Sequence, residues 1–147
     1  MISYRNALRC LWPILLASGI AHAQSTTEAV HTGGIYRSEV QTNAEGTSYI
    51  SVLRFAPDRR VFLTHVAMPA TQARICGWFR PDMEREHWAK GASYHLDGKR
   101  LTFQTASLNA TTSFEGTVES EVLQLQLTVL TRQNLTYPLT FSFAPCP

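Results

Sequence analysis

Alternation of apolar and polar residues in the last third of the chain is the feature that most constrains the fold. In segment 122–130, every second residue is apolar, with glutamine or threonine between; the apolar residues are Leu123, Leu125, Leu127 and Val129. Period-two alternation is typical of a β-strand with one buried and one polar face. Segments 101–108, 112–119 and 136–143 also read as strands. The links between them are too short for crossover helices, so we expect an antiparallel meander.

The first 23 residues have the features of a secretory signal peptide. Arg5 and Arg9 precede a short apolar run at 11–21, and Ala21 and Ala23 form a small-x-small cleavage site. This run is about half of the ~20 apolar residues that a membrane-spanning helix needs. We therefore predict a signal peptide at 1–23, a flexible leader at 24–32 and one folded domain at 33–147. The mature protein should be periplasmic or secreted and should not span a membrane.

The charge of the mature chain gives no indication of a nucleic-acid partner. Two of the 13 Lys and Arg residues lie in the signal peptide, so 13 − 2 = 11 basic residues remain against 11 acidic ones. A nucleic-acid-binding protein shows a basic surplus on some face. We therefore expect no nucleic-acid partner.

Removal of the signal peptide leaves an even number of cysteines. Cys10 leaves with it, and Cys76 and Cys146 remain. Disulfides form and persist in the compartments to which exported proteins go, so we predict a Cys76–Cys146 bridge. Closing a loop of about 70 residues would stabilise the fold by about 4 kcal/mol in the chain-entropy model. The alternative is two free thiols or a redox pair.

The rest of the chain supplies further strands and one short helix. Segments 35–40, 49–55, 61–67 and 92–96 read as strands, and turn residues occur at 57–59 and 97–98. Segment 73–79 is a possible ninth strand. Segment 82–90, between Pro81 and Gly91, is the one expected to be helical. The fold class predicted is all-β: an up-and-down antiparallel meander of eight, possibly nine, strands that closes into a barrel, since closure removes exposed edges.

Several short motifs resemble those of lipocalin-like (calycin-type) exported bacterial barrel domains. The opening Gly34-Ile-Tyr36 is similar to the lipocalin Gly-x-Trp, and residues 53–58 resemble an Arg-Phe-x-Pro-Asp-Gly turn. The hairpins at 91–103 and 114–125 are of the same style. Tyr36 stands where the tryptophan would be, and Arg59 where the turn glycine would be. The resemblance implies a barrel that binds a small, mostly apolar molecule in its cup.

Candidate ligand-lining residues come from alternating strand positions and from the tryptophans of the irregular segment, where a lid over the barrel mouth would lie. They are Tyr36, Leu53, Phe55, Phe103, Leu125, Leu127, Tyr137 and Phe141, with Trp78 and Trp88 near the opening. Alternation does not say which face points inward, so these residues could instead form a closed core.

No combination of residues predicts catalysis, a metal site or a cofactor. The histidines of the mature chain (His31, His65, His87 and His95) lie one per segment and without metal-ligand spacing. His65 and His95 lie on expected strands and could meet inside, although we favour polar faces for both. We therefore predict a protein that is not an enzyme.

Two functions from different classes remain. The first is an exported, lipocalin-like barrel that binds a small apolar ligand. The second is a periplasmic protein-binding module, an inhibitor or an envelope-assembly factor, that has a filled barrel and acts through its loops. An outer-membrane barrel is disfavoured, because its strands would show a continuous apolar band and typically a terminal aromatic residue.

Overall fold

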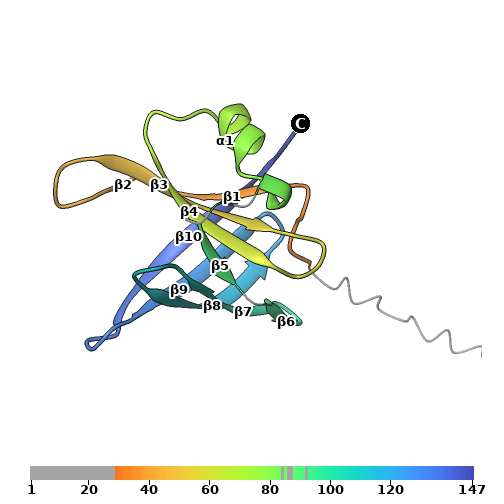
Figure 1. The fold of residues 1–147 in the computed structure, drawn as a ribbon. Helices are drawn as coiled ribbons and strands as arrows, with labels where there is room; N and C mark the ends of the chain where they lie inside the picture. Colours follow the sequence, from red (N-terminus) through yellow and green to blue (C-terminus); the bar gives the residue numbers. More distant parts are fainter. Residues whose placement is uncertain (1–28, 84, 86–87, 92) are drawn as a thin grey trace, which may run out of the picture.

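The structure is a computed structural model that describes residues 29–83, 85, 88–91 and 93–147. The predicted signal peptide and residues 24–28 of the predicted leader lie outside the described residues. Strands make up most of the described residues (Figure 1), which also contain one α-helix, α1 (Gln72–Trp78), and one 3-10 turn, η1 (Pro81–Met83). The strands are β1 (Gly34–Ser38), β2 (Gln41–Thr42), β3 (Ser48–Phe55), β4 (Val61–Ala67), β5 (Ala89–Gly91), β6 (His95–Asp97), β7 (Arg100–Ala106), β8 (Thr111–Glu119), β9 (Val122–Leu130) and β10 (Leu135–Pro145).

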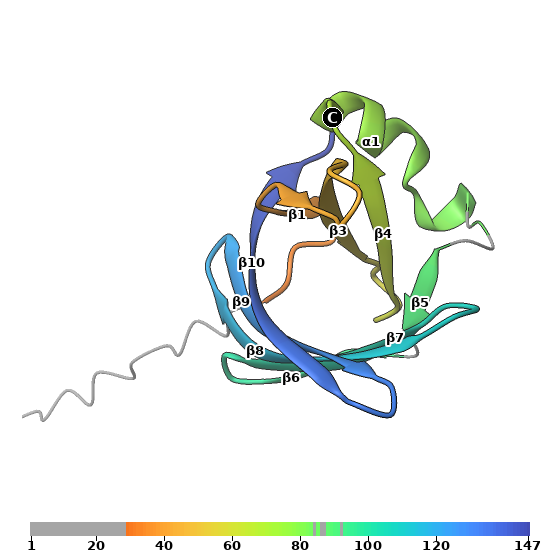
Figure 2. The same cartoon turned by 90° about the vertical axis from the view of Figure 1, so that its left-hand side faces the viewer.

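Eight of these strands form a closed antiparallel barrel. The sheet runs β1-β10-β9-β8-β7-β5-β4-β3, and β1 also pairs with β3, which completes the circle. Figure 2 looks along the barrel and shows the strands as a ring. Strands β2 and β6 are additions, β2 at the edge of β3 and β6 beside β7. The predicted fold class is confirmed.

The two ends of the barrel differ. The β7–β8 and β9–β10 turns and the β2–β3 hairpin lie at one end, which we call the open end; the β3–β4 and β8–β9 turns lie at the other, the plugged end. At the plugged end Val30 is buried within the interior core, and the backbone N–H of His31 donates to the Tyr36 hydroxyl at 2.9 Å. The His31 ring stacks on Phe143 with 4.4 Å between ring centroids. The packed part of the chain therefore begins before Gly33.

Apolar residues form two cores, one inside the barrel and one outside it. The interior core gathers alternate residues from strands around the ring, among them Tyr36, Leu53, Phe55, Phe103, Phe114, Leu125, Leu127 and Phe141. The outer core lies between α1 and the outer face of β1, β3 and β4, and contains Ile35, Ile50, Val52, Ala56, Phe62, Ile75, Cys76, Phe79 and Trp88. The wall formed by β1, β3 and β4 is therefore covered on both faces.

The position of the helix corrects two sequence expectations. Segment 73–79, a possible strand, lies almost wholly in helix α1; Thr71 caps its first turn, accepting the N–H of Arg74 on its side chain at 3.4 Å. Ile75 and Phe79, four residues apart, both reach the outer core, which is helical rather than strand periodicity. Segment 82–90, expected to be helical, contributes only the end of η1 and the start of β5, and residues 84, 86 and 87 within it lie outside the described residues.

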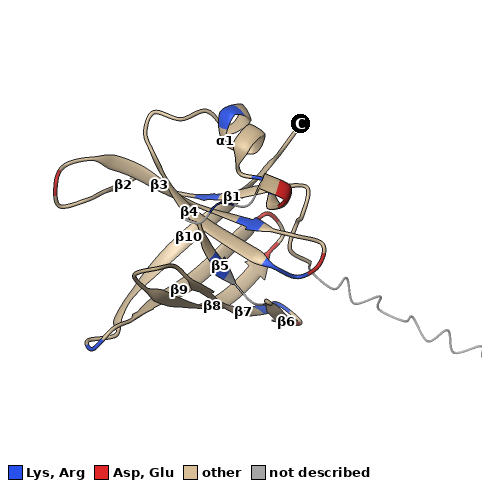
Figure 3. Cartoon of the chain, viewed as in Figure 1, with Lys and Arg blue, Asp and Glu red and all other residues tan. Residues whose placement is uncertain are grey.

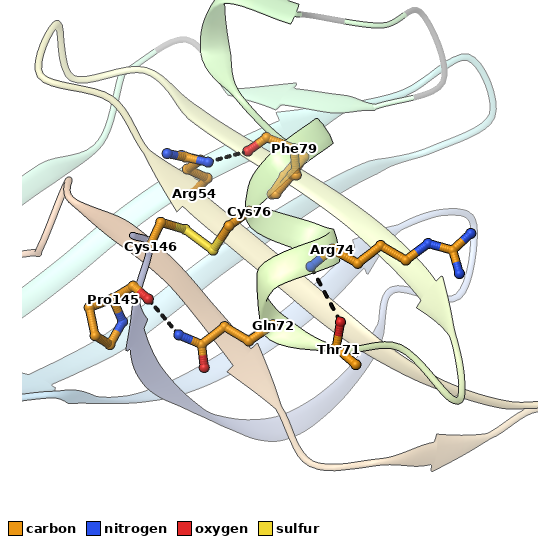
Figure 4. The surroundings of a disulfide bond; sticks show 8 residues. All are labelled: Arg54, Thr71, Gln72, Arg74, Cys76, Phe79, Pro145 and Cys146. Carbon is orange, nitrogen blue, oxygen red and sulfur yellow. Dashed lines mark hydrogen bonds between the residues drawn. A yellow bond between two sulfur atoms is a disulfide. The ribbon is translucent and has the colours of Figure 1, made fainter.

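The predicted disulfide is confirmed. Cys76 of α1 is bonded to Cys146, just beyond β10, with 5.6 Å between their Cα atoms (Figure 4). Two hydrogen bonds hold the same helix: Gln72 Nε2 donates to the Pro145 carbonyl, and Arg54 Nη1 donates to the Phe79 carbonyl, each at 2.5 Å. Helix α1 is thereby fixed to β3 and to the end of β10.

The predicted turns form where the sequence indicates. Gly98 has a φ of 57° between β6 and β7, and Arg59, which stands where resembling domains have a glycine, has a φ of 68° between β3 and β4. The expected strand 92–96 is shorter than predicted, because β5 ends at Gly91 and β6 begins at His95. Among the described residues, no helix is both long and apolar enough to cross a membrane.

Gly116 permits the close approach of β8 and β9 and gives the first testable prediction. A Cβ at this position would overlap the backbone carbonyl oxygen of Gln124 and lie 2.9 Å from the Cα of Leu125. Gly116→Ala should therefore lower the free energy of unfolding by about 1–3 kcal/mol, as overpacking does.

The matched control is Gly77→Ala in α1, where an added Cβ meets nothing within 4 Å. In this variant the free energy of unfolding should rise by about 0.5–1 kcal/mol, because alanine is the better helix former. Denaturant unfolding of both variants measures the difference. Equal effects of the two substitutions would contradict the observed pairing of β8 with β9.

Candidate functional site at the open end of the barrel

A pocket of about 270 Å³ opens into the barrel at the open end. It forms because β5 is short: β4 pairs with β5 only at Phe62 and Leu63, so beyond Leu63 no described strand pairs with this edge of β4. The lining residues come from β4, β5, the β7–β8 turn, β8, β9 and β10, and are Leu63, Thr64, His65, Ala89, Ser107, Ala110, Thr112, Leu127, Val129 and Tyr137.

Apolar and polar residues line the pocket in equal number, and no charged residue is among its described lining residues. Leu63 and Leu127 lie where the interior core meets the pocket, and they form the floor of the pocket. Ala89, Ala110 and Val129 add apolar wall. The polar groups of the lining are the imidazole of His65 and the hydroxyls of Thr64, Ser107, Thr112 and Tyr137. Lys, Arg, Asp and Glu are absent from its described lining. Figure 3 shows charged residues elsewhere on the barrel, at hairpin tips and also within strands such as β5. Apolar walls with a few placed polar groups are typical of small-molecule sites.

A chain of hydrogen bonds orients His65 beside the pocket. Gln41 Nε2 donates to Ser38 Oγ at 3.1 Å and to Ser51 Oγ at 3.2 Å. Ser51 Oγ lies 3.1 Å from His65 Nδ1. The Tyr49 hydroxyl donates to Gln41 Oε1 at 3.3 Å, and its ring meets the His65 ring edge-on with 5.5 Å between centroids. The imidazole is thus held from two sides.

The surroundings of His65 favour the neutral imidazole. The ring borders the interior pocket and also a depression of about 380 Å³ on its other side, so solvent still reaches it. The protein around it nevertheless removes part of its hydration, and this desolvation lowers the pKa of His65 below the ordinary histidine value. No acidic group contributes to the shift.

The structure separates the predicted ligand-lining residues into three groups. Tyr36, Leu53, Phe55, Phe103, Leu125, Leu127 and Phe141 all face the barrel interior. Of these seven only Leu127 lines the pocket; it is joined there by Tyr137, which is partly exposed at the edge. Trp78 and Trp88 belong with the outer core under α1, where their ring centroids are 6.1 Å apart, and neither is among the pocket-lining residues.

Sequence reasoning missed the polar part of this site. His65 follows Val61 and Leu63 at intervals of two, so the alternation could have placed it on the interior face. It does not meet His95, which pairs with Thr102 in the β6–β7 hairpin. Gln41 and the two-residue strand β2 left no recognisable pattern, because a strand of two residues is too short for one.

The edge of the open end exposes apolar side chains. Leu108 in the β7–β8 turn is 90% exposed, and Leu130 and Leu135, on either side of the β9–β10 turn, are also exposed. The neighbouring turn residues are mostly uncharged, with Arg132 the one charged residue between Leu130 and Leu135. We call Leu108, Leu130 and Leu135 the leucine rim.

A larger depression, of about 510 Å³, lies against β7 and β8. Its lining includes Lys90, His95, Gln104, Ser113 and Glu115. The side chains of Gln104 and Ser113, paired across the two strands, alternate with the interior residues Phe103 and Phe114, so this depression is on the outside of the barrel. Its lining contains charged residues and lies on the outer face of the sheet. We take the smaller interior pocket, with no charged residue among its described lining, as the better candidate site.

Comparison with known proteins adds no family assignment. No protein-family model, curated protein or solved structure matches this chain. The closed eight-stranded antiparallel barrel with one short helix is consistent with a lipocalin-like fold on architecture alone.

The lowered pKa of His65 predicts a pH dependence of stability. Because the unfolded chain binds a proton at a higher pH than the folded one, the free energy of unfolding should fall as the pH drops below the ordinary histidine value of about 6.5. Denaturant unfolding at pH 7.5 and pH 5.0 measures this fall. His65→Gln should show a smaller fall than the wild type, and His95→Gln, on the β6–β7 hairpin, is the control. A fall of the same size in His65→Gln would show that His65 contributes nothing to it.

Proposed function

We propose that this protein is an exported, lipocalin-like carrier that binds a small, mostly apolar molecule in the pocket at the open end. The observation that carries the proposal is the asymmetry of the barrel. One end is plugged by Val30 and by the contact of His31 with Tyr36, whereas the other contains an apolar-floored pocket above Leu63 and Leu127. A barrel with one closed end and one open end has the form of a cup.

The volume of the pocket sets the size of the ligand. At the share of about 30 Å³ that a water molecule takes in the liquid, 270 Å³ holds roughly nine non-hydrogen atoms. The interior below is filled by aromatic residues such as Phe55, Phe103 and Phe114, packed ring against ring. A long acyl chain does not fit beneath Leu63, so the carrier would take a compact molecule.

Two features of the chain support the exported location that the proposal assumes. The N-terminal 23 residues read as a signal peptide, and the Cys76–Cys146 disulfide suits an oxidising compartment. A carrier in the periplasm or outside the cell would meet small molecules that cross the envelope. The absence of a catalytic constellation from the sequence is in keeping with binding without chemistry.

Fluorescence titration with the small, uncharged, environment-sensitive fluorophore 1-aminonaphthalene tests the proposal. The wild type should bind it saturably. Val129→Trp, which fills the pocket, should weaken binding about tenfold or more, since burial of the probe is lost.

The matched control is Leu130→Trp, at the adjacent residue, which points to the opposite face of β9 and should leave the affinity unchanged. No saturable binding by the folded wild type would contradict the carrier. Equal weakening by both substitutions would place the binding elsewhere.

The leucine rim favours a second candidate, a protein-binding module that acts through its loops. Exposed apolar residues at neighbouring turns are a common feature of protein-interaction surfaces. A photo-crosslinking residue in place of Leu108 or Leu135 should then capture one defined envelope protein, whereas one in place of Thr117 on the barrel wall should not. That result, together with no binding of 1-aminonaphthalene, would favour this candidate over the carrier.

A further inference from the structure

We propose that His65 recognises the ligand by donating a hydrogen bond from Nε2–H, so that the ligand is an uncharged apolar molecule that carries one acceptor oxygen, such as a ketone or an ester. This inference rests on the carrier function proposed above and adds the chemical class of its ligand. It follows from the direction of each hydrogen bond behind the pocket.

Ser38 determines which group donates and which accepts in each hydrogen bond of this network. Ser38 Oγ donates its one hydrogen to the Glu39 carbonyl at 2.8 Å and accepts the backbone N–H of Ser51 at 2.9 Å. It therefore has no hydrogen left for Gln41, and can only accept from it. The Gln41 amide must turn its NH₂ group toward the serines, which leaves Oε1 to accept from the Tyr49 hydroxyl.

Ser51, which lies between Gln41 and His65, determines the tautomer of His65 in the same way. Ser51 is 2% exposed, and its Oγ accepts one of the two Gln41 amide hydrogens. Its own hydrogen has one remaining partner among the described residues, His65 Nδ1 at 3.1 Å. Nδ1 is then an acceptor, and the neutral imidazole carries its hydrogen on Nε2.

The hydrogen on Nε2 has no protein acceptor in the described part of the chain. The one described side-chain hydrogen bond of His65 is made by Nδ1, and the ring borders the pocket whose floor is Leu63 and Leu127. His65 is the one side chain with an N–H donor among the described residues that line this uncharged pocket. The other polar lining side chains, those of Thr64, Ser107, Thr112 and Tyr137, carry hydroxyls, which both donate and accept. A neutral imidazole whose free nitrogen can only donate favours a ligand with an acceptor group. Desolvation, which keeps the imidazole neutral, gives no advantage to an anionic ligand over a neutral one.

A pair of competitors that differ in one atom tests the inference. At pH 7.5 each is titrated against bound 1-aminonaphthalene: acetophenone, a compact ketone, and α-methylstyrene, in which a CH₂ group replaces the carbonyl oxygen. The ketone should bind roughly 3- to 10-fold more tightly than the alkene, the usual net effect of one hydrogen bond. Benzoate, an anion of similar size, should not bind more tightly than the ketone.

Variants locate the preference at His65. His65→Phe keeps a ring but removes the donor, so the ratio of the two affinities should fall to about one, while the alkene still binds. His95→Phe, on the β6–β7 hairpin, should keep the wild-type ratio. If 1-aminonaphthalene and the alkene bind to the wild type without a preference for the ketone, or if His65→Phe retains it, the inference fails and the carrier function stands. If nothing binds to the wild type, the carrier function fails.

NMR of the wild type tests the inference without relying on a variant that folds. Long-range ¹H–¹⁵N correlation of the imidazole rings should show His65 as the Nε2–H tautomer, and addition of acetophenone should shift its Nε2 resonance. An Nδ1–H tautomer in the free protein, or an unchanged Nε2 resonance at saturating ketone, would overturn the proposal.

Discussion

The double pairing of β1 is the constraint on which the rest of the structure depends. Tyr36 lies opposite Phe143 of β10 on one side and opposite Leu53 of β3 on the other, so the first strand joins the end of the meander to its beginning. Without the β1–β3 pairing the sheet would have two free edges and no interior. Closure creates an inside and an outside, and the N-terminal residues Val30 and His31 then make one end different from the other. The cup form follows from these two facts.

Closure alone leaves the outer face of β1, β3 and β4 apolar, and α1 covers it. Strand β4 begins with four buried residues in succession, whereas β9 alternates buried and exposed residues. The first pattern belongs to a wall buried on both faces and the second to a wall with a solvated face. The Cys76–Cys146 bond fixes the helix to the last residues of the chain, so the disulfide holds the outer core closed rather than the barrel mouth.

This difference between the two walls explains which parts of the fold could be predicted from the sequence. The strands from residue 100 onward were found to within a few residues, because each has one wet face and clear alternation. Helix α1 was not, because its short segment, interrupted by Gly77, resembles a short strand. The residues of the outer core that it packs against also lie far away in the sequence. Trp78 and Trp88 were expected at the mouth for the same reason, since nothing local indicates a second core. In the pocket, Leu127 and Tyr137 follow from alternation, but the chain from Gln41 through Ser51 to His65 depends on three strands meeting in space.

The most direct test of this account is a measurement of the backbone contacts of β1 in solution. In a uniformly labelled, oxidised sample of the mature chain, cross-strand NOEs from the backbone of Tyr36 should reach both Leu53 and Phe143. Their joint presence would establish the closed ring, on which the interior of the barrel depends. NOEs from Tyr36 to Phe143 but none to Leu53 would mean an open, curved sheet, and would contradict the account.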